Sequence, residues 1–300
     1  MIRKPAPLRR GDVIGVVAPA GAVDETSLET GVRLLEAAGF RVQLGAAVHQ
    51  QDGYLAGTDT QRVADLHEMF ADPQVKAIIA ARGGYGAGRL LPLLNPAIIL
   101  ENPKIFVGHS DITFLLNYLV KLAGQVSFHG PMVTAFQERP EALDLLLSML
   151  TGDRTRWHEP AQEVIQPGTA EGRLVGGCLS ILVATLGTPY AVDARGCLLF
   201  LEDVNEQPYR IDRMLTHLRQ AGALDGVAGV IFGEMSGCMA TPDEQVSVRD
   251  VVAKAFSLAS YPVAFGLPSG HGLGTLTLPL GIRARLAGER LTLLESPLAE

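Results

Sequence analysis

The 300-residue sequence is poor in cysteine. Its three cysteines, Cys178, Cys197 and Cys238, are an odd number, and no two of them have the C-x-x-C spacing. A disulfide framework is therefore disfavoured, and a reducing compartment fits the composition better.

The sequence also lacks a basic surface signal. Its 25 Lys and Arg residues are outnumbered by 32 Asp and Glu residues, which gives a formal net charge of −7. No run of basic residues is longer than the pair Arg9-Arg10. A large basic face for a nucleic-acid backbone is thus excluded as a main feature, so we expect no nucleic-acid partner.

Long apolar runs are missing as well. No uninterrupted apolar stretch approaches the length of a membrane span. Near the N-terminus, Ala18-Pro19-Ala20 resembles a signal-peptide cleavage site, but the apolar run before it, Val13–Ala18, is too short for a signal and follows Asp12. We therefore expect a soluble, cytoplasmic protein without a membrane partner, in which Val13–Ala18 is a buried first strand.

Several nucleotide and metal motifs are absent. The glycine-rich segment RGGYGAGRLL (Arg82–Leu91) does not have the G-x-G-x-x-G spacing, no Gly-Lys pair exists for a P-loop, and H-E-x-x-H does not occur. The segment is equally consistent with two readings. Its backbone N–H groups could hold an anionic oxygen, or it could be a turn that only joins a strand to a helix.

The first half of the chain alternates between strand and helix patterns. This alternation predicts an open, mostly parallel α/β sheet with helices on both faces and a ligand site beyond the carboxyl ends of the strands. The expected strands are Val13–Ala18, Arg41–Leu44, Lys76–Ala81 and Lys104–Val107, and the expected helices are Glu25–Ala38 and Gln61–Phe70.

The pattern breaks at residues 151–172, which are polar and rich in Pro and Gly and predict a linker. We therefore expect an N-terminal α/β domain at 1–150 and a C-terminal domain at 173–300. The second half mixes strands and helices and predicts a smaller, strand-rich α/β domain. It ends in an expected hairpin of Thr275–Pro279 and Arg283–Leu294.

Ser110 lies in the most informative segment. A short apolar strand, Ile105–Val107, precedes it, and apolar residues at helical spacing follow from Ile112 onward. Ser110 is thus predicted on a tight strand-to-helix turn, with the N–H groups of the first helical turn, beginning at Asp111, directed at whatever its hydroxyl attacks. The commoner role of such a serine is a helix N-cap.

A serine nucleophile needs a base and an orienting acid. His129 and His271 are both glycine-flanked histidines after strand-like runs, and the residues alone do not separate them. Glu202 and Glu234 each follow the end of an expected strand, and the ordinary reading of both is a partly exposed strand-end carboxylate.

Five segments together resemble the LD-carboxypeptidase family, which includes the muramoyltetrapeptide carboxypeptidases of murein recycling. In chain order they are RGGYGAGRLL, GHSDIT, LVGGCLSILVATLGTPY, LFLEDVNEQPYRIDRML and GLPSGHG. The resemblance runs from Val16–Gly21 to Leu276–Gly281, nearly the whole chain. It implies an N-terminal α/β domain and a smaller C-terminal domain, with the active site in the cleft between them.

The resemblance also implies site residues. The serine of GHSDIT, Ser110, would be the nucleophile, the histidine of SGHG, His271, the base, and the glutamate of LEDVNE, Glu202, the acid. The oxyanion hole would use the backbone N–H groups of Asp111 and Gly84, with Gly83 as the alternative. His129 and Glu234 become secondary.

The implied reaction removes a terminal D-alanine from cytoplasmic murein tetrapeptide by cleaving its amide with the L-centre of meso-diaminopimelate, without a metal or other cofactor. Arg82, Tyr85 and Arg210 are the expected substrate-binding residues, and a homodimer is expected. One alternative within the family is a microcin C-type self-immunity peptidase. Such members have an added loop near the triad glutamate, whereas here LEDVNEQPYRIDR runs straight into a helix. A non-catalytic peptide-binding module is the alternative from another class.

Overall fold

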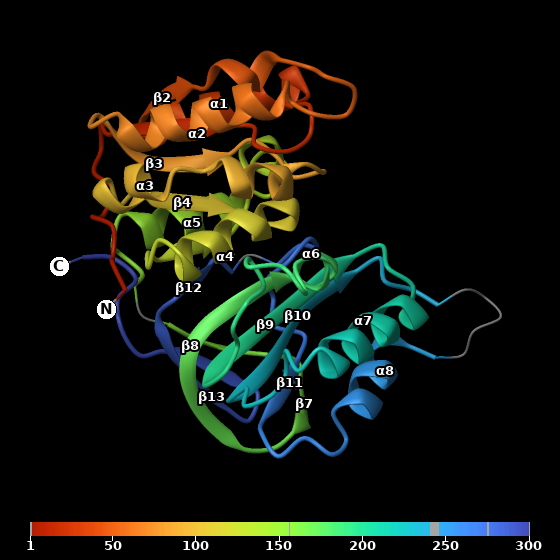
Figure 1. Cartoon of the computed structure of the whole chain (residues 1–300). Helices are drawn as coiled ribbons and strands as arrows, with labels where there is room; N and C mark the ends of the chain where they lie inside the picture. The colour runs from red at the N-terminus through yellow and green to blue at the C-terminus, as the bar shows by residue number, and fades with distance from the viewer. Residues whose placement is uncertain (1, 156, 241–245, 275, 300) are drawn as a thin grey trace. The chain divides into compact units, whose positions relative to one another are not determined.

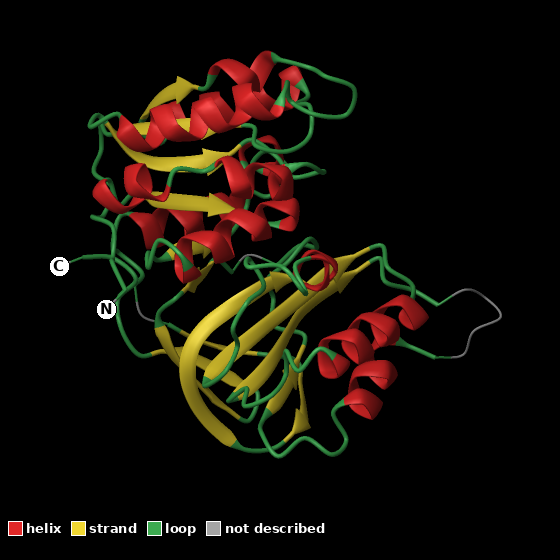
Figure 2. Cartoon of the chain, viewed as in Figure 1, coloured by secondary structure: helices red, strands yellow, loops and turns green. Residues whose placement is uncertain are grey.

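The computed structural model describes residues 2–155, 157–240, 246–274 and 276–299 (Figure 1). The chain divides into two compact units. The first contains Met1–Thr155, Thr275–Leu280 and Pro297–Glu300, and the second contains Arg156–Gly274 and Gly281–Ser296. Each unit is built on its own β-sheet with helices packed against it (Figure 2). No helix in the described part of the chain is long and apolar enough to cross a membrane.

The first unit contains a six-stranded sheet with the strand order β12-β5-β4-β3-β1-β2. All neighbouring pairs are parallel except β12 with β5. Its strands are β1 (Val13–Val17), β2 (Arg41–Leu44), β3 (Val75–Ala80), β4 (Ile105–Gly108), β5 (Ser127–His129) and β12 (Leu278–Leu280).

Helices cover both faces of this sheet. In the sheet, β2 lies on one side of β1, and β3, β4 and β5 follow in order on the other side. The connection from β1 to β2 therefore runs in the direction opposite to the later ones. Because parallel crossovers are right-handed, α1 lies on one face and α2, α3 and α4 lie on the opposite face. The predicted doubly covered, mostly parallel sheet is thus confirmed. The helices of this unit are α1 (Glu25–Ala37), α2 (Asp59–Ala71), α3 (Pro96–Glu101), α4 (Thr113–Lys121) and α5 (Pro140–Leu150), with short 3-10 turns η1 (Ala46–His49), η2 (Ala87–Leu93), η3 (Ser110–Ile112) and η4 (Val133–Ala135).

Local sequence explains where the first helices begin. The Asp24 side chain accepts a hydrogen bond from the Ser27 N–H at 2.9 Å and caps α1. Thr58 and Gln61 form a reciprocal capping box at the start of α2. The sheet is covered by helices on both faces, and every residue of β1 is buried, as its uninterrupted apolar run predicts.

The second unit contains an eight-stranded mixed sheet in the order β6-β14-β13-β8-β9-β10-β11-β7. The four central strands from β8 to β11 are parallel, and the outer pairs are antiparallel. Helices α7 (Pro208–Gln220) and α8 (Val248–Ala255) lie side by side in this unit, which also holds α6 (Leu179–Ala184) (Figure 1). Its strands are β6 (His158–Pro160), β7 (Glu163–Gln166), β8 (Thr169–Cys178), β9 (Cys197–Val204), β10 (Gly229–Ser236), β11 (Val263–Phe265), β13 (Arg283–Ala287) and β14 (Arg290–Leu293).

The segment predicted as a linker, residues 151–172, instead contributes strands to the second sheet. It contains β6, β7 and the start of β8, and β6 and β7 are the two edge strands of the second sheet. No residue of these two edge strands is fully buried. Edge strands tolerate Pro and polar side chains, which is why their composition looks like that of a loop.

The predicted C-terminal hairpin is also wrong in its pairing. Leu278–Leu280 pairs antiparallel with Ser127–His129 of the first sheet, while the hairpin is formed by β13 and β14. All three residues of β12 are buried. Residues 276–280 thus belong to the first unit, so the expected continuous domain at 173–300 is interrupted, and Thr275 of the predicted hairpin lies outside the described residues.

Candidate active site

The loops after β1 and β3 meet at the point where the strand order of the first sheet reverses. The Gly21 N–H donates to the Gly83 carbonyl at 3.1 Å, and the Ala22 N–H donates to the Tyr54 carbonyl at 3.1 Å. The exposed Arg82 guanidinium donates to the Ala22 carbonyl at 2.9 Å. In open α/β sheets this switch point is where ligands bind. The hydrogen bonds fix three loops together at that place.

Ser110 lies at the same edge of the sheet. It follows β4 after one intervening residue and is the first residue of η3, which continues into α4. Its φ of 61° is in the left-handed region, which a non-glycine residue adopts only when its surroundings impose it. The sequence prediction of a tight strand-to-helix turn at Ser110 therefore matches the structure, and the strain is typical of functional turns.

The glycine-rich loop lies directly against Ser110. A Cβ atom added to Gly83 would be 2.9 Å from the Ser110 Cβ and 3.0 Å from its Oγ. Any larger residue at this position would displace the hydroxyl. Gly84 follows with a φ of 111°, which also requires glycine. The backbone of this loop thus borders the Ser110 hydroxyl, as an oxyanion-binding loop must.

Asp111 joins that loop to the Ser110 turn. Its backbone N–H lies in the first turn of η3, where N–H groups have no acceptor within the helix. Its carboxylate is 1% exposed and accepts a hydrogen bond from the Ala87 N–H at 2.7 Å. Burial raises the pKa of the Asp111 carboxyl to about 6, although the hydrogen bond from Ala87 and the nearby Arg62 guanidinium oppose this shift.

His109 and His129 are both buried in the first unit. His109, the residue before Ser110, has its Nδ1 3.0 Å from the Gly130 carbonyl oxygen. Its ring lies 5.9 Å from that of His129, which is part of β5 and 1% exposed. His109 is therefore held by backbone, and His129 is a core residue of the sheet.

His271 and Glu202 form a close pair in the second unit. The distance between His271 Nδ1 and Glu202 Oε2 is 2.6 Å. Glu202 is wholly buried on β9, and the His271 side chain is 13% exposed. A buried carboxylate that accepts from one ring nitrogen fixes the tautomer and orientation of the imidazole, so that Nε2 is the nitrogen that exchanges a proton. A histidine held in this way by a buried carboxylate is chemically suited to act as a general base.

Glu234, which the sequence left level with Glu202, has a different set of contacts. Its two carboxylate oxygens accept from the N–H groups of Gly272 and Gly274 at 3.0 and 2.8 Å. Glu234 thus contacts the backbone beside His271, whereas Glu202 contacts the imidazole.

The expected substrate-binding residues fall in both units. Tyr85 is 55% exposed, and its ring packs edge-on against that of Tyr54 at 5.6 Å. Arg210 lies on α7, where its Nε donates to the Tyr209 hydroxyl at 3.2 Å and its Nη1 is 3.6 Å from Glu206 Oε2. Tyr54 was not predicted from the sequence, where it is a single aromatic residue in a polar loop. Only the fold brings it to Tyr85.

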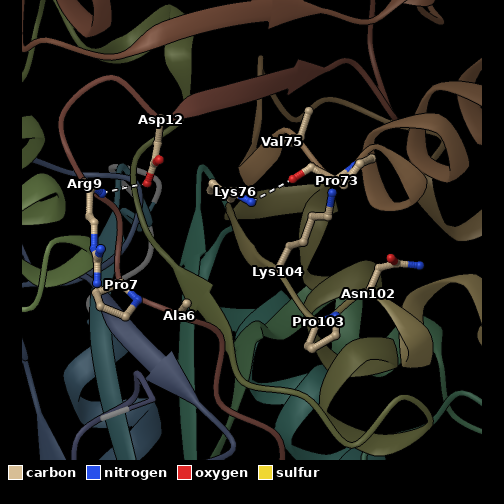
Figure 3. A pocket seen from close by; sticks show the side chains of 10 residues that line it. All are labelled: Ala6, Pro7, Arg9, Asp12, Pro73, Val75, Lys76, Asn102, Pro103 and Lys104. Carbon is tan, nitrogen blue, oxygen red and sulfur yellow. Dashed lines mark hydrogen bonds between the residues drawn. The ribbon is translucent and has the colours of Figure 1, made fainter.

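A pocket of about 450 Å³ at the opposite edge of the first sheet is also lined by charged residues (Figure 3). Its lysines already have partners in the fold. Lys104 Nζ donates to the Met69 carbonyl in the last turn of α2 at 2.9 Å, and Lys76 Nζ donates to the Pro73 carbonyl, beyond the end of that helix, at 2.7 Å. Burial lowers the pKa of Lys104 to about 8. Lys104 thus caps the C-terminal end of α2, and the pocket lies at the amino ends of the strands, away from Ser110.

Comparison with known proteins places this geometry in a family. The profile of the LD-carboxypeptidase N-terminal domain matches residues 14–130, and that of the C-terminal domain matches residues 171–286. The probable murein peptide carboxypeptidase of Bacillus subtilis (strain 168) is 40% identical over 99% of this chain and 96% of its own.

Two solved structures have the same fold along their length. The muramoyltetrapeptide carboxypeptidase from Oxalobacter formigenes superposes with a TM-score of 0.86 at 31% identity, covering 95% of this chain and 99% of its own. The microcin C7 self-immunity protein MccF in its wild-type apo state superposes with a TM-score of 0.90 at 25% identity, covering 99% of this chain and 100% of its own. The two domain matches and the full-length relatives confirm the family that the motifs predicted: the chain belongs to the LD-carboxypeptidase family of serine peptidases.

Proposed function

We propose that this protein is a serine carboxypeptidase of murein recycling in the cytoplasm. It would hydrolyse the amide between the L-centre of meso-diaminopimelate and the terminal D-alanine of a murein tetrapeptide. The observation that carries the proposal is the 2.6 Å contact between His271 Nδ1 and the buried Glu202, a base–acid pair of the kind that activates a serine. The names of the Bacillus and Oxalobacter proteins support murein peptides as the substrate.

The first half of the reaction acylates Ser110. Its Oγ attacks the carbonyl carbon of meso-diaminopimelate while His271 Nε2 takes the hydroxyl proton and Nδ1–H stays bonded to Glu202. The negative charge that develops on the carbonyl oxygen is stabilised by the backbone N–H groups of Asp111 and Gly84. His271 then gives its proton to the leaving amine, so that D-alanine departs and the tripeptide remains as an ester on Ser110.

The second half repeats these steps with water. His271 takes a proton from the water, the hydroxide attacks the ester carbonyl, and the proton returns to Ser110 Oγ as the tripeptide leaves. No redox step or metal-bound nucleophile is needed. Ser110 lies in the first unit and the His271–Glu202 pair in the second. Comparing the loss of turnover in Ser110→Ala, in His271→Ala and in the double variant is therefore a direct test of this mechanism.

A carboxypeptidase must also recognise the terminal carboxylate. We propose Arg82 as its principal cation, because the residue follows β3 at the edge that holds Ser110 and is exposed. Arg210 is a secondary candidate, since Glu206 already neutralises part of its charge at 3.6 Å. Tyr85, together with Tyr54, offers an exposed aromatic edge for the remainder of the peptide.

The structural likeness to the microcin C7 self-immunity protein favours one competing substrate, an aminoacyl nucleotide. The short connection between β9 and α7, residues 205–207, supports the murein substrate, since it leaves no room for an added loop after Glu202.

Incubation with murein tetrapeptide and, separately, with aspartyl sulfamoyl adenosine, followed by mass analysis, decides between these substrates. We expect the tetrapeptide to lose one alanine, with and without EDTA, and the nucleotide to be cleaved at least tenfold more slowly. Faster cleavage of the nucleotide, or activity that EDTA removes and zinc restores, would contradict the proposal. The same sample in multi-angle light scattering tests the homodimer that we also propose.

A further inference from the structure

Glu234 occupies an irregular place in its strand. Along β10, Phe232 pairs with Leu201 of β9, but the next pair is Met235 with Asp203. Three steps along β10 therefore match two along β9, which defines a β-bulge at Gly233 and Glu234. Bulges re-aim side chains and occur often beside active sites. This one lies opposite Glu202, the residue of β9 between the two regular pairs.

The bulge brings Glu234 into contact with the backbone on both sides of His271. Its backbone N–H donates to the Ser269 carbonyl at 3.0 Å. Its carboxylate accepts from the N–H groups of Gly272 and Gly274 at 3.0 and 2.8 Å. A single residue thus makes three hydrogen bonds that bracket His271 in the chain.

The bracketed segment needs such support because glycines flank its histidine. Gly270, with a φ of 148°, precedes His271, and Gly272 follows it. Glycine restricts the backbone least of all residues, so this loop has little stiffness of its own. Yet the imidazole must keep its 2.6 Å contact with Glu202 while its charge changes during turnover. Bonds from the N–H groups to an ionised carboxylate are among the stronger ones available to hold it.

The close packing of the loop supports the same reading. A Cβ atom added to Gly272 would lie 2.6 Å from Glu234 Oε1, and one added to Gly274 would lie 2.7 Å from Oε2. At the bulge itself, a Cβ on Gly233 would lie 2.3 Å from the Ser269 carbonyl oxygen. Glycines on both sides of the contact allow the carboxylate to reach the backbone.

We propose that Glu234 is a positioning residue for the base: its carboxylate holds the N–H groups of Gly272 and Gly274, its backbone N–H holds the Ser269 carbonyl, and the loop so held fixes the imidazole of His271 against Glu202. The inference rests on the proposed function for its kinetic consequence, but the geometry that it describes is independent of the substrate. The hydrogen bonds of Glu234 described above go to backbone groups of the loop, so its proposed effect on the imidazole is transmitted through the loop.

The kinetic test compares Glu234→Gln and Glu234→Ala with the matched control Glu163→Gln, a partly exposed glutamate of the same unit that pairs with Arg249. Gln has one acceptor oxygen, so it keeps one of the two hydrogen bonds from the glycine N–H groups. Its N–H₂ group faces the other N–H and cannot accept from it. Because small misplacements of a catalytic group cost about 10²-fold in rate, we expect kcat to fall about 10²-fold in the Ala variant and less in Gln. KM and the melting temperature should change little, and Glu163→Gln should match the wild type.

The variant Gly272→Ala, alone and combined with Glu234→Ala, provides an independent check on the same contact. Its Cβ displaces the Glu234 carboxylate, so the single variant should lose activity to a similar degree as Glu234→Ala. The double variant should lose little more than either single variant, because both changes break the same contact. Losses that multiply in the double variant would contradict the proposal.

The ¹H–¹⁵N resonances of the His271 ring provide a readout that requires no substrate. In the wild type we expect one tautomer with a strongly downfield Nδ1–H; in Glu234→Ala this signal should broaden or shift toward a mixture of tautomers. An unchanged His271 spectrum together with kcat within twofold of wild type overturns the role of Glu234. If the wild type does not cleave murein tetrapeptide at all, the proposed function fails, and the spectrum alone then decides whether Glu234 positions the imidazole.

Discussion

Replacing Asp111 by Asn should change the pH dependence of stability in a defined direction. The carboxyl is buried, and its pKa is raised from 3.8 to about 6 in the folded protein. A group with a raised folded-state pKa contributes stability below its unfolded value, and that contribution is lost as the pH rises through the folded value. One pKa unit corresponds to about 1.4 kcal/mol, so burial of the ionised Asp111 costs about 3 kcal/mol above pH 7.

Asn cannot ionise, so it avoids this cost while its carbonyl oxygen can still accept from the Ala87 N–H. The variant also loses other hydrogen bonds to the carboxylate. This loss lowers its unfolding free energy by about 1 kcal/mol at every pH. The difference in unfolding free energy between Asp111→Asn and wild type should therefore move in favour of the variant by about 2–3 kcal/mol from pH 4 to pH 7.5.

Urea unfolding at a series of pH values measures this difference. The matched control is Asp144→Asn, an exposed carboxylate of α5 in the same unit, which should show almost no pH-dependent difference. A pH-independent difference for Asp111→Asn would refute the argument, because the carboxyl would then titrate alike in the folded and unfolded chains.

Three further changes test the reaction itself. Ser110→Ala should reduce turnover by several orders of magnitude with little change in melting temperature, and more than a tenth of wild-type activity would exclude Ser110 as the nucleophile. His271→Ala should be as damaging, and the double variant should be little slower than either single one, since triad members act as a unit; a much slower double variant would separate them. Gly83→Ala, whose Cβ would lie 3.0 Å from Ser110 Oγ, should lower kcat about 10²-fold, and unchanged kinetics would show that the loop does not border the reaction.

The turn at Ser110 could be predicted because its signals are local. An apolar strand, a glycine and a helical apolar period surround the serine, and the structure has a strained residue at that position. The strands and helices of the first half follow from the same kind of pattern. Parallel α/β units are built from neighbouring elements, so their order in the chain largely determines their pairing.

The features that the sequence did not predict depend on contacts between distant residues. Glu202 and Glu234 look alike as strand-end carboxylates, and only the bulge in β10 gives them different partners. The strand Leu278–Leu280 pairs across about 150 residues with Ser127–His129, which no local pattern indicates. The edge strands between residues 158 and 166 carry polar residues because they lack a neighbour on one side, so their composition resembles that of a linker.

The prediction that Ser110, His271 and Glu202 form a triad came from the family resemblance rather than from patterns of polarity. Glu202→Gln should lower turnover on the order of 10³- to 10⁴-fold, because the amide favours the wrong tautomer of His271. Activity close to wild type in this variant would mean that the 2.6 Å contact is structural.

The most direct measurement for the central claim is the mass of the covalent intermediate. The protein is mixed with murein tetrapeptide, quenched in acid within milliseconds and digested, and the peptide that contains Ser110 is analysed. We predict an ester of the tripeptide on Ser110 that is absent from Ser110→Ala and disappears as D-alanine release is completed. Hydrolysis of the tetrapeptide with the acyl group on another residue, or with undiminished turnover in Ser110→Ala, would contradict the assignment of this protein as a Ser110-dependent carboxypeptidase.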